Sequence, residues 1–235
     1  MLILTPRLSA VAGYVLPGQP LADVGTDHAY LPAWLVGAGR VPRAIATDLM
    51  PGPLEAARAT VVAEGLTDRI DLRLGSGLGP VVPGEAVCAT ICGMGGALIA
   101  TILAAGPLGG IHRLVLQPMG GEERLREWLC GSGWRLVDEA LVEDGGRIYA
   151  ILVAEPGCMT LTPTELVAGP FLLQKGGPLL ARYAGILLQQ ARRARAGAGR
   201  SERPQARERV DLLEDRIRLW EEVVARAESN GRPSC

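Results

Sequence analysis

The sequence has few of the residues that build metal centres, disulfide frameworks or membrane spans. No apolar run reaches the ~18 uncharged residues that a membrane helix needs, and no basic segment with an apolar leader core opens the chain. The only histidines are His28 and His112, which excludes a histidine-rich metal site. We therefore expect a cytoplasmic protein that binds neither a metal nor a membrane.

Cysteines are also too scattered to form a framework. There are five of them, no two have Cys-x-x-Cys spacing, and most are interpreted as small core hydrophobes. They are Cys88, Cys92, Cys130, Cys158 and Cys235. Charge is distributed unevenly along the 235 residues: residues 1–181 carry 12 basic and 17 acidic side chains, whereas residues 182–235 carry 12 basic and 8 acidic ones. An acidic body is thus followed by a basic tail.

A strand–turn–helix pattern near the start lacks most of the glycines of a dinucleotide-binding fingerprint. The apolar segment 20–24 runs into Gly25, and a helical apolar pattern begins at Ala29. Asp27 occupies the position of the second fingerprint glycine and Ala29 that of the third. A carboxylate at this turn would repel a pyrophosphate but suits a cofactor with a cationic centre.

The acidic residue expected after the next strand is present. Residues 43–48 are predicted to form a strand that ends in Asp48, about 20 residues beyond the turn, where a carboxylate accepts hydrogen bonds from a ribose diol. The alternative interpretation is an ordinary β-turn and a surface aspartate.

Strands and helices alternate through the first 155 residues. Strands are expected over 20–24, 43–48, 70–74, 86–92, 112–117, 134–142 and 147–155, with helices over 29–36, 51–65, 98–103 and 122–130. This order predicts an α/β fold whose seven-stranded, mostly parallel sheet has helices on both faces. Asp144-Gly145-Gly146 is a hairpin signal that adds an antiparallel strand.

The loops that follow the first five strands should meet at the carboxyl edge of this sheet, where such folds bind ligands. These loops carry Gly25 to His28, Asp48, Ser76 to Leu78, Gly93 to Gly96, and Gln117. A junction rich in Gly, Pro and Thr at residues 156–163 predicts two domains, 1–157 and 158–235.

The second domain is expected to be a helical hairpin. Val210, Leu213, Ile217, Trp220 and Val224 follow a heptad spacing, and Leu180, Tyr183 and Leu187 have a similar spacing upstream. The segment 197–204 between them is interpreted as a turn. Alternatively, the hairpin only dimerises or packs on the body, so the chain is expected to be a monomer or a weak dimer.

Four segments of the sequence together resemble the bacterial tRNA (adenine-22-N1)-methyltransferase family, TrmK. They are residues 22–32 (ADVGTDHAYLP), 90–96 (TICGMGG), 114–118 (LVLQP) and 144–153 (DGGRIYAILV). The resemblance implies a Rossmann-like class I methyltransferase with a C-terminal coiled coil, S-adenosyl-L-methionine as cofactor and tRNA as substrate. One departure is Met119, which follows Gln-Pro where the family tends to have asparagine.

The resemblance also assigns roles to residues. Those expected to bind the cofactor are Asp23, Gly25, Thr26, Asp27, Asp48, Leu49, Ser76, Gly77, Gly93, Met94 and Gly95. The resemblance also places Gly93 to Gly96 at the mouth of the target-base pocket. Those expected at the substrate are Gly96, Gln117 and Pro118, and the candidate catalytic residues are Asp27, His28 and Tyr30. His28 can equally be a histidine bonded to backbone, and Tyr30 a helix-packing residue.

The chemistry of these residue types agrees with methylation of a ring nitrogen. Adenine N1 has an in-plane lone pair, so alignment with a methyl donor is the main task. A carboxylate such as Asp27 could stabilise the cation that methylation produces. The loop at 93–96 lacks the Asn/Asp-Pro-Pro-aromatic motif of enzymes that methylate exocyclic amines. Since N1 lies on the Watson–Crick edge, the base must be extruded to react.

Arginines near the tip of the hairpin are candidates for the tRNA backbone. Phosphate contacts dominate nucleic-acid affinity, and the acidic body is a poor platform for them. The candidates are Arg192, Arg193, Arg195 and Arg200.

Other function classes remain open at this point. A methyltransferase that modifies another RNA position is one alternative. A nicotinamide-dependent oxidoreductase is disfavoured by the missing third glycine and by Asp27. A non-catalytic tRNA-binding module is disfavoured by the retained Asp23, Gly25 and Asp48.

Overall fold

The computed structural model describes residues 2–198 and 204–230, and the chain divides into two compact units, 1–159 and 160–235. Within the described ranges no helix is long and apolar enough to cross a membrane. The same residues contain no group of three or more His, Cys, Asp or Glu side chains that could hold a metal ion.

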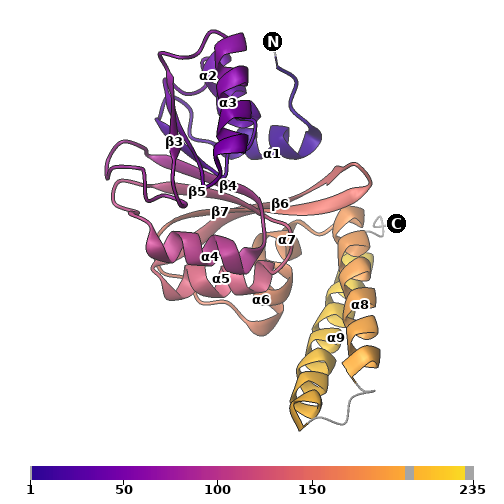
Figure 1. Cartoon of the computed structure of the whole chain (residues 1–235). Helices are drawn as coiled ribbons and strands as arrows, with labels where there is room; N and C mark the ends of the chain where they lie inside the picture. Colours follow the sequence, from indigo (N-terminus) through magenta and orange to yellow (C-terminus); the bar gives the residue numbers. More distant parts are fainter. Residues whose placement is uncertain (1, 199–203, 231–235) are drawn as a thin grey trace. The chain divides into compact units, whose positions relative to one another are not determined.

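The first unit is built on one sheet of seven strands in the order β3-β2-β1-β4-β5-β7-β6 (Figure 1). The strands are β1 (Leu21–Val24), β2 (Ala44–Asp48), β3 (Ile70–Leu74), β4 (Cys88–Met94), β5 (Arg113–Pro118), β6 (Trp134–Asp144) and β7 (Arg147–Pro156). Neighbours among β1 to β5 pair in parallel, and β7 is antiparallel to both β5 and β6. The predicted seven-stranded mixed sheet is confirmed, and its order reverses between β1 and β4.

Helices cover both faces of the sheet (Figure 1). One face carries α1 (Pro6–Tyr14), α2 (Tyr30–Gly37) and α3 (Pro51–Ala63), and the other carries α4 (Gly96–Ala105) and α5 (Glu122–Gly131). The helix α1 was not predicted from the sequence. Its start nevertheless has a signal, because the Thr5 hydroxyl accepts a hydrogen bond from the Leu8 amide and Pro6 occupies the first turn.

The main core lies between α1, α2, α3 and one face of the sheet. Cys88, Val115 and Ile151 contribute to it from β4, β5 and β7, together with Val11 of α1. Side chains alternate between the two faces of a strand, so residues two positions further along lie on this same face. Asp23, Thr90 and Gln117 are therefore on the α1 side, at the carboxyl edge of the sheet.

The turn between β6 and β7 has a tight hairpin geometry. Gly145 and Gly146 join β6 to β7 with φ of 57° and 75°, as a type I′ hairpin requires. The tip lies past the last β5–β7 pair, Leu116 with Leu152, by five residues of β7, or about 17 Å. This β6–β7 arm therefore extends beyond the carboxyl edge of the central strands.

The end of β4 differs from its prediction. The strand was expected to end at Cys92 and a loop to cover 93–96, but β4 continues to Met94 through an irregularity at Gly93, whose φ is 76°. The strand therefore carries a bulge, a feature that is common next to active sites. Gly95 alone separates this strand from α4.

The second unit contains α6 (Pro163–Ala168), α7 (Pro170–Lys175), α8 (Pro178–Ala198) and α9 (Pro204–Asn230). Helices α8 and α9 form the predicted hairpin, and Tyr183 meets Trp220 edge to face with centroids 6.2 Å apart. On α8 the predicted Leu180 and Tyr183 are buried. One turn further along, Leu188 is buried in place of the predicted Leu187, because burial follows the 3.6-residue period through Ala184. Most of the predicted turn at 197–204 lies outside the described residues.

Candidate functional site

The turn after β1 is held in an uncommon backbone conformation. Gly25 has φ of 68°, and the amides of Gly25 and Thr26 donate to the Thr47 carbonyl at 2.8 and 3.0 Å. Asp27 and Ala29 are the described non-glycine residues with positive φ, at 52° and 55°. Such residues cost on the order of 1–3 kcal/mol each and concentrate at functional sites. The turn that the sequence singled out is therefore also the strained segment of the fold.

The Asp23 side chain is hydrogen-bonded to this turn and to β4. Its side chain is buried, and its two carboxylate oxygens accept hydrogen bonds from the hydroxyls of Thr90 at 2.5 Å and Thr26 at 2.7 Å. Burial raises the pKa of the Asp23 carboxyl, while the two hydroxyls act in the opposite direction. Asp23 thus links β1, the turn and β4, and this placement makes it a structural support of the turn.

Asp48 lies directly beside the turn, at the end of β2. Its carboxylate accepts the amide of Asp27 at 3.2 Å and that of Met50 at 3.0 Å. The adjacent Leu49 and Met50 side chains are 63% and 57% exposed. A strand-end carboxylate with exposed apolar neighbours fits a nucleoside, whose ribose needs acceptors and whose base needs an apolar surface.

The loop after β3 joins the same edge. The Thr47 hydroxyl donates to the Gly77 carbonyl at 2.8 Å, and Ser76 beside it is exposed. Gly77 has φ of 58°, and a Cβ at this position would lie 2.7 Å from Ile102 Cγ2. The structure therefore brings Ser76 and Gly77 next to the end of β2, as predicted for loops that follow parallel strands.

Gly25 has a packing reason to be glycine. A Cβ added there would lie 2.1 Å from Cε of Met94, at the end of β4. The Met94 side chain thus reaches across to the β1 turn and covers it. Two residues that were predicted separately as cofactor-binding, Gly25 and Met94, are in direct contact.

The loops after β4 and β5 are bound to each other. The Met119 amide donates to the Met94 carbonyl at 2.8 Å, and the Gly96 amide donates to the Gly120 carbonyl at 2.8 Å. A Cβ on Gly96 would lie 2.2 Å from the Gly121 carbonyl oxygen. These loops are therefore joined through their backbones, and Gly96 is required by the close approach of the two.

The residues predicted to contact substrate from these loops are not at the surface. Gly96, Gln117 and Pro118 are all buried, and the Gln117 side-chain amide is used inside the protein. In place of the predicted direct contact, the structure gives them a supporting position. The side chain that this part presents to solvent is Met119, which is 47% exposed.

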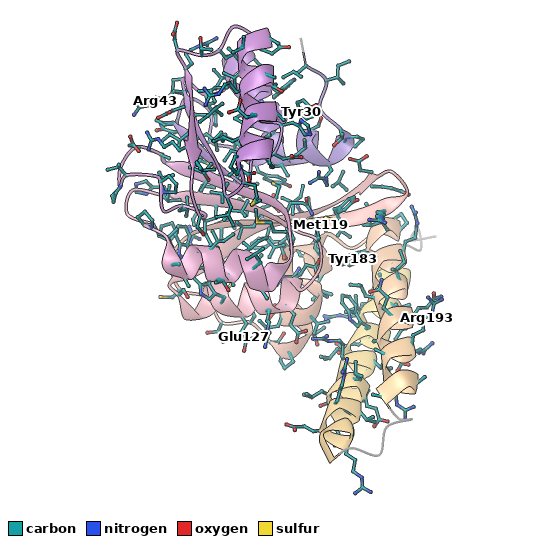
Figure 2. All side chains as sticks on the ribbon, viewed as in Figure 1. Tyr30, Arg43, Met119, Glu127, Tyr183 and Arg193 are labelled. Carbon is teal, nitrogen blue, oxygen red and sulfur yellow. The ribbon has the colours of Figure 1, made fainter. Side chains whose placement is uncertain are left out.

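The three candidate catalytic residues are exposed together at the start of α2. His28 Nε2 lies 3.8 Å from Asp27 Oδ1, and the His28 and Tyr30 rings stack with centroids 5.2 Å apart and an interplanar angle of 7°. Tyr30 is 43% exposed, which favours a surface role over the helix-packing interpretation. Tyr30 and Met119 are labelled in Figure 2.

The arginines predicted to contact tRNA fall into two groups. Arg192 pairs with Glu221 at 2.7 Å and Arg195 with Glu214 at 2.5 Å across the hairpin. Arg193 is exposed, extends outward from α8 (Figure 2), and makes no ion pair with another described residue. Arg200 lies outside the described residues.

Three arginines that are relevant to the site or to the hairpin were not predicted from the sequence. Arg207 and Arg209 are exposed in the first turns of α9 and, among the described residues, form no ion pair. Arg7 of α1 donates to Gln117 at the end of β5. A helix signal at Thr5-Pro6 could have located α1, but the partner of Arg7 is 110 positions away in sequence.

Comparison with known proteins agrees with this site. Residues 4–152 match the family model described as a methyltransferase domain. The tRNA (adenine(22)-N(1))-methyltransferase of Bacillus subtilis (strain 168) is 38% identical over 231 residues, which cover 94% of this chain and 97% of the relative.

Solved structures give the same relationship. The Bacillus subtilis M1A22 tRNA methyltransferase TrmK superimposes with a TM-score of 0.87 at 36% identity, covering 95% of this chain and all of that one (100%). A Streptococcus pneumoniae protein in complex with S-adenosyl-L-methionine has a TM-score of 0.84 at 36% identity and covers 94% of this chain and 100% of its own.

The fold and the site define a Rossmann-like methyltransferase. Within that class, the extent of identity shows that the chain belongs to the tRNA (adenine(22)-N(1))-methyltransferase family, TrmK. Family membership confirms the resemblance seen in the sequence, and it favours a methyltransferase over both the nicotinamide-dependent oxidoreductase and the non-catalytic module.

The role of Asp48 can be tested by cofactor titration. Asp48→Ala is expected to weaken S-adenosyl-L-methionine binding on the order of 10- to 100-fold, because a hydrogen bond to a charged acceptor contributes about 1.5–3 kcal/mol. Asp71→Ala is the matched control, since Asp71 is an exposed carboxylate on the adjacent strand that pairs with Arg73. Equal affinities for the Asp48→Ala variant and the unaltered protein would remove Asp48 from the cofactor site.

Proposed function

We propose that this protein transfers a methyl group from S-adenosyl-L-methionine to N1 of adenine 22 in tRNA. The observation that carries the proposal is the near full-length identity to the Bacillus subtilis enzyme named for this reaction. The joined loops at the carboxyl edge of β1, β2, β4 and β5 supply a site of the required kind. Since the substrate is tRNA, we place the reaction in the cytoplasm.

The reaction requires little proton transfer by the protein. The cofactor supplies an electrophilic methyl group on a sulfonium centre. Adenine N1 attacks with its own lone pair, so the task of the chain is to align the two groups and to stabilise the positive charge that the base acquires. Asp27 is the exposed carboxylate at the turn, and His28 lies 3.8 Å from it.

The base must leave the tRNA stack to present N1, and exposed side chains at the site can compensate for lost stacking. The His28–Tyr30 stack presents an aromatic face, and the Met119 side chain presents a polarizable apolar one. We assign both to the surface that receives the extruded adenine.

The tRNA backbone is proposed to lie against the α8–α9 hairpin. Arg193, Arg207 and Arg209 are the exposed cations there that remain without an ion pair among the described residues. Arg192 and Arg195 are engaged with glutamates, although exposed pairs of this kind contribute only about 0–1 kcal/mol and can yield to phosphate.

A transfer assay with labelled cofactor tests the function. The protein is expected to methylate a tRNA transcript with adenine at position 22 and to leave a transcript with guanine at that position unlabelled. Equal labelling of the two transcripts would contradict the assignment of the target nucleotide.

Asp27→Asn is expected to lower kcat at saturating tRNA while cofactor affinity changes little. Asparagine tolerates the left-handed backbone of residue 27 but removes the charge that faces the developing cation. Asp27→Gly is the matched second variant, because glycine adopts φ of 52° without steric strain and also lacks the charge. Steady-state kinetics would show a structural role if both variants keep the kcat of the unaltered protein, and a binding role if only the KM for cofactor rises.

A further inference from the structure

We propose that Arg7 is a positioning residue for methyl transfer, acting through Gln117 on the two loops that form the substrate side of the site. This inference rests on the proposed function. Arg7 belongs to α1, a helix that was not predicted from the sequence and that has no role in the reaction described above.

The contact between Arg7 and Gln117 is direct. The Arg7 Nη1 donates to Gln117 Oε1 at 2.5 Å, from a half-buried guanidinium to a fully buried amide. Both groups lie on the same side of the sheet, since Gln117 is two residues past Val115 in the α1-side core. A buried amide oxygen is thereby given a charge-assisted partner.

Gln117 is also hydrogen-bonded to both loops. The same Oε1 atom accepts the Gly93 amide at 3.2 Å, at the bulge of β4, and Nε2 donates to the Pro118 carbonyl at 2.8 Å. The backbone bonds between Met119 and Met94 then join the loops to each other. The orientation of the Gln117 amide therefore sets where Met94 and Met119 lie.

Arg7 is itself fixed by the β6–β7 arm. Its backbone amide donates to Asp144 Oδ2 at 3.2 Å, and its guanidinium carbon lies 5.6 Å from the centroid of the Tyr149 ring. A cation held over a ring and hydrogen-bonded to a buried amide has little freedom to turn toward solvent. These contacts favour a positioning role over a direct phosphate contact.

The test compares Arg7→Ala, Arg7→Lys, Gln117→Ala and the Arg7→Ala/Gln117→Ala double variant in the full-length protein. Arg7→Ala is expected to lower kcat on the order of 10- to 100-fold, because small misplacements of the reacting groups are costly. Arg7→Lys, which keeps a donor and a charge, is expected to recover part of that loss. Arg58→Ala, at an exposed pair with Glu55, serves as the matched control.

The double variant distinguishes the mechanisms. If Arg7 acts through Gln117, the double variant is no slower than Gln117→Ala alone, because residues that act as a unit are not additive. Cofactor affinity should change much less than kcat in Arg7→Ala and in Gln117→Ala.

Three results would overturn the inference. One is an unchanged kcat in Arg7→Ala. Another is a double variant whose loss is the product of the two single losses, with the loss in the KM for tRNA and a smaller dependence of tRNA affinity on salt. That result would make Arg7 a phosphate contact. The third is a parallel loss of cofactor affinity and thermal stability, which would make its role structural. Absence of methyl transfer to adenine 22 by the unaltered protein in the same assay would instead contradict the proposed function.

Discussion

Replacing Arg193, Arg207 and Arg209 together by glutamine is expected to weaken tRNA binding about 100-fold at roughly 0.1 M salt. All three are exposed, and none forms an ion pair with another residue that the structure describes. Arg193 is in the last turns of α8 and the other two are in the first turns of α9. All three therefore belong to the end of the hairpin at which α8 ends and α9 begins. Each phosphate contact contributes about 0.7–0.9 to the slope of log affinity against log salt, so the slope should fall by about two.

The control for this prediction has the same change in charge on the first unit. Arg40, Arg43 and Arg58 lie outside the loops of the proposed site, and their replacement by glutamine should leave tRNA affinity and its salt slope nearly unchanged. Cofactor affinity should be unaffected in both triple variants. Filter-binding titrations over a range of salt concentrations measure both quantities, and indistinguishable slopes would exclude the hairpin tip as a phosphate-binding surface.

The largest expected effect on stability comes from the buried ion pair between α5 and β6. Arg126 Nε donates to Glu139 Oε1 at 2.7 Å, and their side chains are 1% and 0% exposed. Arg126→Ala leaves the Glu139 carboxylate buried without this partner and is expected to lower the free energy of unfolding by about 3–5 kcal/mol. Urea denaturation followed by circular dichroism measures the change.

Two companion variants make the stability prediction specific. Arg126→Met combined with Glu139→Gln removes both charges and should be much less destabilising than Arg126→Ala, because it also removes the buried carboxylate that Arg126→Ala leaves behind. Arg58→Ala disrupts an exposed pair at 3.8 Å and should cost less than about 1 kcal/mol. An Arg126→Ala protein as stable as the Arg58→Ala protein would show that the buried pair contributes little.

Local sequence signals were sufficient to predict most strands of the sheet. Alternating residues predicted β3 at 70–74, and the adjacent glycines 145 and 146 predicted the β6–β7 hairpin. The position of Asp48 at a strand end predicted its place beside the β1 turn, and its bond to the Asp27 amide agrees with that placement. These features depend on neighbours in sequence or on the rule that parallel strands end at one edge.

What the sequence could not supply are contacts between distant segments. The Arg7–Gln117 bond spans 110 positions, and it buries an amide that sequence reasoning placed at the substrate. The Arg192–Glu221 and Arg195–Glu214 pairs span 29 and 19 positions and engage two of the predicted tRNA contacts. No periodicity or spacing in the chain reports which oxygen faces which guanidinium.

The central claim is methylation of N1 of adenine 22, and mass-spectrometric mapping of modified nucleosides tests it most directly. Unmodified tRNA is incubated with the protein and S-adenosyl-L-methionine, cut into defined fragments and mapped. We predict 1-methyladenosine in the fragment that contains position 22 and in no other fragment. N6-methyladenosine at that position, or a methylated nucleoside confined to another fragment, would contradict this account.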